Sequence, residues 1–403
     1  MRILYNYIKG ILALIINGFP SNKLKIIGIT GTKGKTTTAN FIWTVLNNNG
    51  YKSGLIGTAN IRIGDKECLN IYHMTMPSHF VIQKLFRDMV AAKCKYCVME
   101  VTSEGIKRYR HLGIKFDTVI FTNLTPEHLP SHQNSFENYK AAKMKLFKKC
   151  PKLIIANADD SHFTDFLNNN CSDKKTFSIN NKSNYQALVL DSSTSVTNFE
   201  VKKEKYTINI LGIFNIYNAL PAIIVGKYLK LSQKQIQTGF DKLKSIPGRM
   251  EFIKNKKNLN LIVDYAHEPV SLKWLLDTAK SITLKNNKII LVLGAEGGGR
   301  DPAKRAPMGE LANKYADFAI VTNVDPYSDN PQKIADDIAV KIDNKKLFVI
   351  LDREEAIKKA ISLASKNDTV LITGKGAETS ITIDSKKYPW DDRQTVKSVL
   401  NSV

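Results

Sequence analysis

The sequence predicts an α/β protein of two domains, each built on a mostly parallel sheet. Three observations lead to this fold class. The length of 403 residues exceeds what one hydrophobic core supports. Short β-branched runs alternate with helical stretches, and a glycine-rich turn near residue 30 lies between a strand and a helix. We expect an N-terminal helical segment over 1–22, a central domain over 23–245 and a C-terminal domain over 246–403.

The net charge of +22 is spread over many lysines and forms no basic arm with interleaved aromatic residues. We therefore expect no nucleic-acid partner. Five cysteines are an odd number, and Cys94 and Cys97 form a lone C-x-x-C without the second pair that a zinc site needs. This usage is typical of thiols in a reducing cytosol, so we expect a cytoplasmic protein.

The N-terminus, residues 1–17, is apolar with two early positive charges. Its longest uninterrupted apolar run, 11–16, is too short to cross a bilayer. The pattern favours a helix packed on the first domain over a helix that contacts a membrane surface.

A phosphate-binding loop is the most informative local feature. A β-branched strand ends at Thr30, the turn TGTKGKTT follows over 30–37, and a helix is expected over 39–47. Glycines let backbone N–H groups approach phosphate oxygens, a lysine supplies a point charge, and a threonine offers a hydroxyl to Mg²⁺. An ordinary βα turn is the alternative, and the pattern lacks a glycine at Ile29. The expected nucleotide contacts are Gly31, Thr32, Lys33, Gly34, Lys35, Thr36 and Thr37, which makes the central domain a P-loop ATPase domain.

The remaining strands follow the same pattern along the chain. In the central domain we expect strands at 53–58, 96–99, 118–121 and 152–156, helices at 75–92 and 136–149, and an antiparallel extension over 185–211. A linker at 245–249 leads to strands at 261–264, 289–293, 318–322, 347–351 and 369–372. Polar residues such as Glu100 end these strands, which indicates a site at the carboxyl edge of the sheet.

Nine short motifs occur in a fixed order. They are 30–37 (TGTKGKTT), 100–103 (EVTS), 121–129 (FTNLTPEHL), 137–147 (ENYKAAKMKLF), 212–215 (GIFN), 247–249 (PGR), 264–267 (DYAH), 298–301 (GGRD) and 374–378 (GKGAE). Together they resemble the Mur ligase family, the ATP-dependent amino-acid ligases of peptidoglycan precursor synthesis, and within it the MurE type.

The resemblance implies a ligase that uses ATP and Mg²⁺ to activate a carboxylate as an acyl phosphate, which an amine then attacks. It implies catalytic roles for Lys35, Glu100, His128 and Lys143. Thr36 and Glu100 would hold one Mg²⁺; His128 and a carbamylated Lys143 would hold a second. The alternative for His128 is a surface histidine. The alternative for Lys143 is one more lysine on a lysine-rich helix.

The resemblance also implies further contacts. For the nucleotide these are Asn215 near the adenine, Arg249 near the phosphates, Asp264 at the ribose and His267 beside it. Asp264 has the alternative role of capping the helix that follows. For the peptide-bearing acceptor the implied contacts are Thr75, Thr102, Ser103 and Arg110, and for the incoming amino acid Asp325, Tyr327, Gly374 and Glu378.

Two departures from the family pattern affect the substrates. The resemblance places the sequence Asp-Asn-Pro-Arg of MurE enzymes that select diaminopimelate where this chain has VDPY (324–327). Tyr327 therefore replaces the arginine, which favours lysine or another amine as the incoming substrate. The phosphate loop begins near residue 30, so we expect a chain that lacks the family's UDP-binding domain. The acceptor would then be held by the two remaining domains, be linked to a different carrier, or require a partner chain.

We therefore expect a monomeric ligase that adds an amino acid to a UDP-MurNAc-dipeptide-like precursor. Two alternatives stay open. One is a related ligase acting on another acid, such as a folate or polyglutamate enzyme. The other is a nucleotide-binding subunit that depends on a partner.

Overall fold

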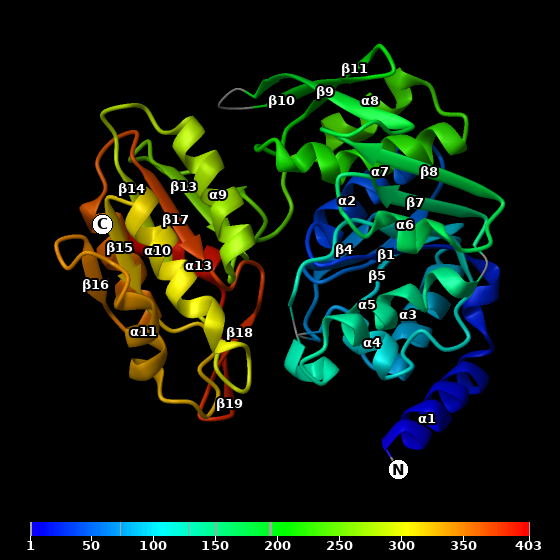
Figure 1. The fold of residues 1–403 in the computed structure, drawn as a ribbon, viewed down its shortest axis with the longest axis horizontal. Coiled ribbons are helices and arrows are strands. Elements are labelled where there is room, and N and C mark those ends of the chain that lie inside the picture. The colour runs from blue at the N-terminus through cyan, green and yellow to red at the C-terminus, as the bar shows by residue number, and fades with distance from the viewer. Residues whose placement is uncertain (1, 73, 128, 150, 193–195, 403) are drawn as a thin grey trace. The chain divides into compact units, whose positions relative to one another are not determined.

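The computed structural model of the chain (Figure 1) describes residues 2–72, 74–127, 129–149, 151–192 and 196–402. The chain divides into two compact units, Met1–Lys244 and Ser245–Val403. Each unit contains a largely parallel sheet flanked by helices. The predicted α/β fold class is therefore confirmed.

Unit 1 contains an eleven-stranded sheet. Its strands are β1 (Lys25–Thr30), β2 (Ser53–Ile56), β3 (Asn60–Ile63), β4 (Lys66–Leu69), β5 (Tyr96–Glu100), β6 (Phe116–Phe121), β7 (Leu153–Asn157), β8 (Asp173–Ser178), β9 (Tyr185–Ser192), β10 (Thr197–Val201) and β11 (Glu204–Ile208). The spatial order is β11-β10-β9-β8-β7-β6-β1-β5-β2-β3-β4. The pairs from β2 to β9 are parallel, whereas β3–β4 and β10–β11 are added antiparallel at the two ends.

The helices of unit 1 cover both faces of this sheet. They are α1 (Arg2–Asn17), α2 (Lys35–Asn47), α3 (His79–Ala91), α4 (Ser103–Lys107), α5 (Phe136–Met144), α6 (Phe163–Leu167), α7 (Phe214–Tyr228) and α8 (Gln233–Lys242), with short 3-10 turns η1 (Pro20–Lys23), η2 (Leu129–His132) and η3 (Phe147–Lys149). Helices α2, α7 and α8 pack together, and α3 to α6 lie over the large core cluster of the sheet. Strand β1 is buried on both sides, which explains its nearly unbroken β-branched sequence.

The helix expected over 136–149 is shorter than predicted. Helix α5 ends at Met144, and the separate turn η3 follows. Two consecutive large side chains at this break, Leu146 and Phe147, are both fully buried. Both side chains belong to the core cluster that covers the sheet of unit 1.

Unit 2 contains a six-stranded sheet and a separate hairpin. The strands are β12 (Glu251–Phe252), β13 (Asn260–Asp264), β14 (Ile289–Leu293), β15 (Phe318–Val321), β16 (Leu347–Val349) and β17 (Thr369–Thr373), and the hairpin pairs β18 (Ser380–Ile383) with β19 (Lys386–Pro389). The sheet order is β12-β13-β17-β14-β15-β16, parallel except for β12. The helices are α9 (Pro269–Ile282), α10 (Arg305–Tyr315), α11 (Pro331–Ala339), α12 (Arg353–Leu363) and α13 (Asp392–Ser402), with the 3-10 turn η4 (Pro302–Lys304).

None of the helices in the described part of the chain is long and apolar enough to cross a membrane. Cys94 and Cys97 are both buried and free. Burial raises the pKa of the Cys97 thiol far above its usual range, so this thiol stays protonated. The two residues therefore contribute to packing, as an unpaired C-x-x-C predicts.

Candidate active site

The phosphate loop lies between β1 and α2, and two of its glycines are required by geometry. Gly31 has φ +147°, and a Cβ there would lie 2.0 Å from Thr122 Oγ1. Gly34 has φ +83°, and a Cβ there would lie 2.3 Å from Asn218 Oδ1. The loop backbone is held from the end of β6, since Thr32 N–H donates to Asn123 O over 2.8 Å. No larger residue fits at either glycine.

Lys35 is the first residue of α2, and its ammonium lies over the loop. Its Nζ donates to Gly31 O at 2.9 Å and to Thr32 O at 2.8 Å. Lys33 points another way and forms an ion pair of 3.0 Å with Glu127. Lys35 is thus the lysine that the loop itself holds in place.

Glu100 ends β5 and is fully buried beside Thr36, the second residue of α2. Its Oε2 accepts from Thr36 Oγ1 and from Thr58 Oγ1, each at 3.0 Å, and its Oε1 accepts from Thr58 N–H at 2.7 Å. The parallel pairing of β1 with β5 places Glu100 next to the loop. The sequence-predicted pair Thr36 and Glu100 therefore lies together, with Thr58 as a third member that sequence reasoning missed. Thr37 is also buried in this first turn of α2.

Lys143 reaches the same loop from α5. It is 2% exposed, its Nζ donates to Gly31 O at 2.8 Å, and its ammonium lies 4.5 Å from the centre of the Tyr139 ring. Burial, together with the ammonium groups of Lys35 and Lys33, lowers the pKa of Lys143 well below its usual value, and Glu127 only partly offsets this. Gly31 O thus accepts from both predicted catalytic lysines. His128, the remaining predicted catalytic residue, lies outside the described residues.

The predicted acceptor contacts lie around the segment before α3. Thr75 Oγ1 is 2.9 Å from Thr58 Oγ1, which links it to the Glu100 carboxylate. The Arg110 guanidinium donates to Met76 O, and burial followed by repulsion from Arg108 lowers the pKa of Arg110.

Thr102 and Ser103 begin α4 directly after β5. Thr102 caps the helix by accepting from Gly105 N–H at 3.1 Å. The buried Ser103 hydroxyl lies 3.0 Å from His132 Nε2. Thr102 N–H also points at Met76 Sδ, 3.4 Å away, so these residues lie at one edge of the sheet with Glu100.

Asn215 is the second residue of α7 and is buried, with both ends of its amide bonded within unit 1. Its Nδ2 donates to Leu211 O at 2.6 Å, and its Oδ1 accepts from Asn218 Nδ2 at 2.8 Å. Asn218 in turn faces Gly34 and accepts from Thr38 Oγ1 at 3.4 Å. Asn215 is therefore connected to the phosphate loop through Asn218, a residue that the sequence did not single out.

In unit 2, Asp264 ends β13 and organises the segments on either side. Its Oδ2 accepts from Met250 N–H and its Oδ1 from Ala266 N–H, both at 2.7 Å. Burial raises the pKa of Asp264, opposed by the Arg249 cation and these hydrogen bonds. Glu268, not Asp264, caps α9, so the helix-cap alternative for Asp264 is wrong.

Arg249 and His267 both contact Tyr265. The Arg249 guanidinium lies 4.3 Å from the centre of the Tyr265 ring, and His267 Nδ1 is 2.7 Å from Tyr265 O. His267 Nε2 lies 3.9 Å from Glu296 Oε1. The three predicted nucleotide contacts of unit 2 therefore form one cluster.

A buried lysine between two carboxylates connects the predicted amino-acid contacts. Lys375 is 1% exposed, and its Nζ donates to Asp325 Oδ2 at 2.7 Å and to Glu378 Oε2. Burial acts to lower the pKa of Lys375, but the two carboxylates outweigh it and raise that pKa. Gly374, with φ +108°, turns the chain at the end of β17. Sequence reasoning included Lys375 in a motif without assigning it a role.

Tyr327 has φ +54° and is covered by a guanidinium. The Arg300 guanidinium lies 4.7 Å from the centre of the Tyr327 ring, and its Nη2 donates to the Tyr327 hydroxyl at 3.1 Å. A cation therefore lies against Tyr327, the residue that stands where the resemblance led us to look for an arginine. Arg300 belongs to the 298–301 motif, yet the sequence alone did not connect it with Tyr327.

The comparisons with known proteins give the family. Residues 29–226 match the model of the Mur ligase middle domain, and residues 248–376 match that of the Mur ligase, glutamate ligase domain. The chain is 39% identical over 390 residues to UDP-N-acetylmuramoyl-L-alanyl-D-glutamate--2,6-diaminopimelate ligase 1 of Clostridium acetobutylicum, covering 95% of this chain and 80% of that protein. The chain belongs to the Mur ligase family. A 2,6-diaminopimelate ligase of the same kind from Bacillus cereus is 35% identical, over 97% of this chain and 81% of that protein.

Solved structures agree with this Mur ligase assignment. A UDP-N-acetylmuramoyl-L-alanyl-D-glutamate--2,6-diaminopimelate ligase superposes with a TM-score of 0.64 at 28% identity, covering 94% of this chain and 78% of that one. Escherichia coli FolC, solved with DHPP and ADP, has a TM-score of 0.74 at 16% identity, covering 98% and 92%, and shows the shared fold alone. The prediction of an ATP-dependent ligase is confirmed, and Mur ligases use ATP and Mg²⁺. The expected lack of a UDP-binding domain stays a prediction.

Proposed function

We propose that this Mur ligase adds a diamino acid to a UDP-N-acetylmuramoyl-L-alanyl-D-glutamate acceptor, with cleavage of ATP to ADP and phosphate. The observation that carries the proposal is the meeting of Lys35, Thr36, Glu100 and Lys143 at one phosphate loop. The names of relatives that match nearly the whole chain supply the substrate class.

The residues of unit 1 fit a divalent cation with a triphosphate. The Glu100 carboxylate and the Thr36 hydroxyl are hard oxygen donors 3.0 Å apart, and Mg²⁺ is held in proteins by one or two such groups plus phosphate oxygens and water. Bound Mg²⁺ would neutralise the charge that develops when two anions react. Lys35 would hold the phosphates, and the amino end of α2 offers its N–H groups to them.

The reaction needs a carboxylate to be activated before an amine can attack it. An acceptor carboxylate oxygen attacks the γ-phosphorus of ATP, the bond to ADP breaks, and an acyl phosphate results. The amine then attacks the carbonyl carbon and phosphate leaves, so one ATP is consumed for each amide formed. We assign acceptor positioning to Thr75, Thr102, Ser103 and Arg110, and nucleotide contacts to Asn215, Arg249, Asp264 and His267.

We also propose that Lys143 carries a carbamate. A buried amine with a strongly lowered pKa is neutral, which is the form that attacks CO₂. The nitrogen–carbon bond forms, the nitrogen loses a proton, and an anionic oxygen ligand results. The neighbouring ammonium of Lys35 would balance that charge, and the ligand would serve a second Mg²⁺ together with His128.

The carbamate predicts that Lys143→Ala removes turnover and that added short-chain carboxylates restore part of it. Lys145→Ala, an exposed lysine two residues further along, is the matched control and should keep full activity. Full activity in Lys143→Ala, or equal rescue of both variants, would reject this role.

Residues of unit 2 would select the incoming amino acid. Glu378 would accept the α-ammonium of the incoming amino acid, and Arg300 against Tyr327 would pair with a distal carboxylate. This arrangement, with the names of the relatives, favours diaminopimelate, whereas Tyr327 alone favours lysine. Arg300→Gln should raise the KM for diaminopimelate and leave that for lysine unchanged, if lysine is used at all.

The central test measures ADP and the mass of the product with purified protein. We expect ADP only when the UDP-linked dipeptide acceptor and a diamino acid are both present, with an amide product. ADP formation with a pteroyl-type acid instead would identify the folate-type ligase. No ADP with any pair would identify a nucleotide-binding subunit that needs a partner. Sedimentation of the same sample tests the expected monomer.

A further inference from the structure

Helix α1 presents its apolar side to the solvent. Its exposed large side chains are Leu4, Tyr5, Tyr7, Ile8, Ile11, Leu12, Ile15 and Ile16, and we call them the outer face of α1. At about 100° per residue these eight positions form one continuous arc of about 180°. A surface helix ordinarily buries its apolar stripe. Here the side toward unit 1 holds the small Gly10 and Ala13 with the half-buried Asn6, Lys9 and Asn17.

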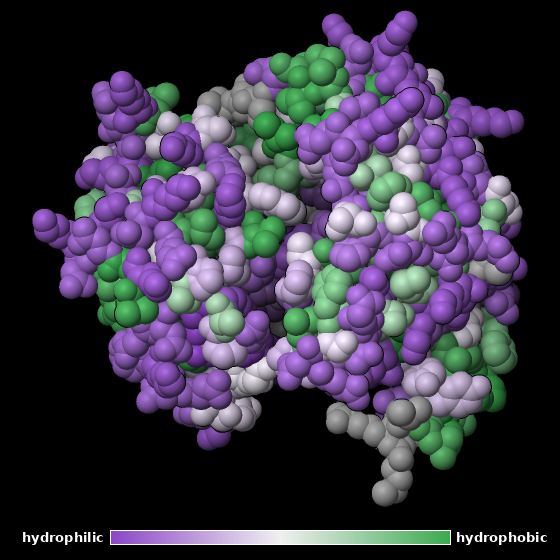
Figure 2. Space-filling model, in the orientation of Figure 1, coloured by the Kyte–Doolittle hydropathy of each residue, from purple (hydrophilic) through white to green (hydrophobic). Residues whose placement is uncertain are grey.

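The helix is nevertheless firmly packed along its inner side. A Cβ on Gly10 would lie 2.9 Å from Leu112, so the helix approaches unit 1 closely there. Leu14 is buried, and Tyr7, at the border of the outer face, also meets Tyr109 edge to face with ring centres 5.9 Å apart. Helix α1 packs on α3 (Figure 1), and Figure 2 shows hydrophobic residues on α1 at the lower right. A fixed apolar face of this extent indicates an interaction surface.

The charge around α1 identifies the class of partner. No acidic residue precedes Asp65 in the chain, and the cations within α1 or directly after it are Arg2, Lys9, Lys23 and Lys25. An apolar face in such a segment fits a surface that is both apolar and anionic.

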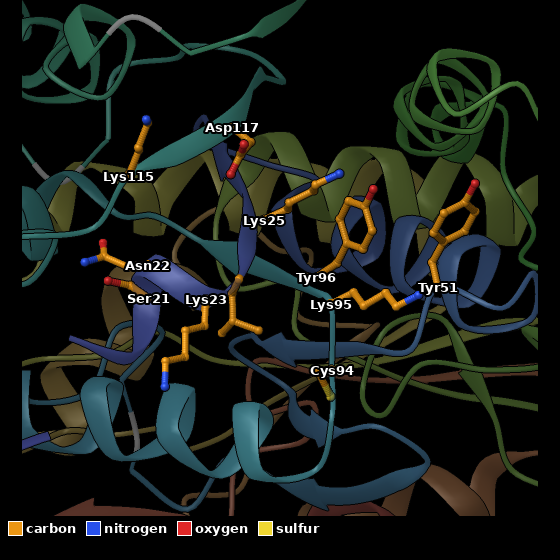
Figure 3. Close-up of a pocket in the computed structure, with 11 residues that line it drawn as sticks. Ser21, Asn22, Lys23, Lys25, Tyr51, Cys94, Lys95, Tyr96, Lys115 and Asp117 are labelled. Carbon is orange, nitrogen blue, oxygen red and sulfur yellow. The ribbon is translucent and has the colours of Figure 1, made fainter. Parts of the chain in front are cut away.

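A basic cavity follows α1 directly in the chain. The turn η1 and the amino ends of β1, β5 and β6 enclose about 730 Å³. Lys23, Lys25, Lys95 and Lys115 line it, and Figure 3 shows Lys25 beside Tyr96. The only acid among the lining residues is Asp117, which already pairs with Lys152 at 3.5 Å and accepts from Ile26 N–H at 3.2 Å. The cavity is therefore suited to anionic groups.

We propose that α1 lies in the interfacial layer of an anionic lipid bilayer, with its outer face among the acyl chains and the lysines of the cavity near the headgroup phosphates. The binding of an interfacial helix grows with its buried apolar area and with its electrostatic attraction to anionic lipids, and the outer face and the cavity lysines supply these two contributions. Sixteen residues span about 24 Å as a helix, which is enough to lie along a membrane and too short to cross one. This inference is independent of the proposed reaction.

Flotation of the full chain with vesicles tests the proposal. We expect binding to vesicles of phosphatidylcholine with phosphatidylglycerol, weaker binding to phosphatidylcholine alone, and a loss of the difference at high salt. The variant Leu4→Ser/Ile8→Ser/Ile15→Ser should bind about tenfold more weakly or worse, since each side chain gives up apolar burial. The matched control Leu188→Ser/Leu284→Ser/Val340→Ser changes three equally exposed apolar residues elsewhere and should bind as the unchanged chain does.

A second variant and its matched control test the lysines of the cavity. Lys23→Gln/Lys25→Gln/Lys95→Gln/Lys115→Gln should lose the preference for anionic vesicles. Lys254→Gln/Lys256→Gln/Lys285→Gln/Lys345→Gln, exposed lysines of unit 2, has the same net charge and should keep it. Thermal unfolding of each variant verifies that it is folded.

Three results would overturn the proposal. They are no vesicle binding by the unchanged chain, equal loss in the α1 variant and its control, and equal binding to neutral and anionic vesicles. A concentration-dependent dimer that the α1 variant abolishes, without vesicle binding, would instead assign the outer face to a second copy.

Discussion

Gly34 shows how a single residue fixes the phosphate loop. Its φ of +83° is unfavourable for any L side chain, and Asn218 Oδ1 occupies the space where a Cβ would go. Because Asn218 is itself bonded to Asn215, the loop cannot easily give way. The loop conformation therefore depends on a close approach between α2 and α7.

A comparison with Gly50 distinguishes the cost of a positive φ from the cost of the contact with Asn218. Its φ is +80°, nearly that of Gly34, but a Cβ there would meet no other atom within 4 Å. Gly50→Ala should cost about 1–2 kcal/mol of stability from backbone strain alone and leave nucleotide binding unchanged. Gly34→Ala should cost more and weaken ADP binding, as titration calorimetry and urea unfolding can measure. Equal effects of the two substitutions would contradict a role for the Asn218 contact.

The lowered pKa of Lys143 predicts that the stability of the folded chain depends on pH. Its pKa is lowered in the folded chain, so the unfolded chain binds a proton that the folded chain has released. Stability should therefore rise with pH from the lowered pKa of the folded state up to the unfolded value of about 10.4. In CO₂-free buffer, Lys143→Met should lack this slope and be at least as stable as the unchanged chain near neutral pH. A pH-independent difference in the free energy of unfolding would argue against a neutral buried amine.

At the scale of elements, the carboxyl ends of parallel strands place the functional groups. Glu100 follows β5, Asn123 follows β6 and the loop follows β1, which are neighbours in the sheet. This part could be predicted from sequence, because buried β-branched runs that end in polar residues identify both the strands and their functional edge. Thr58 could not be assigned, since a threonine two residues after β2 looks like any turn residue.

Lys375 ties three elements of unit 2 together through Asp325 and Glu378. It was not predicted because it is one of 59 lysine and arginine residues, and only the fold brings its carboxylates to it. Lys375→Met should destabilise unit 2 by about 3–5 kcal/mol, because two carboxylates lose their buried cation. The exposed Lys386, changed to Met, is the control. Equal free energies of unfolding in urea for the Lys375 and Lys386 variants would contradict the role of Lys375.

On the scale of the whole molecule, the sequence was enough for the fold class and the family. Nine motifs in order carry that information, and no single motif does. The exposure of the outer face of α1 could not be predicted from sequence. An apolar run indicates burial but does not show which side of the helix is covered. Only the packing of Gly10 and Ala13 against unit 1 reveals that the large side chains point outward.

The activation of a carboxylate as an acyl phosphate is the claim on which the proposed function depends. Its most direct measurement uses an acceptor whose reacting carboxylate carries ¹⁸O, followed by mass analysis of the released phosphate. We predict one ¹⁸O atom in each phosphate formed during amide synthesis, because that oxygen bridges carbon and phosphorus in the intermediate. Phosphate without ¹⁸O, released while amide is still made, would contradict it.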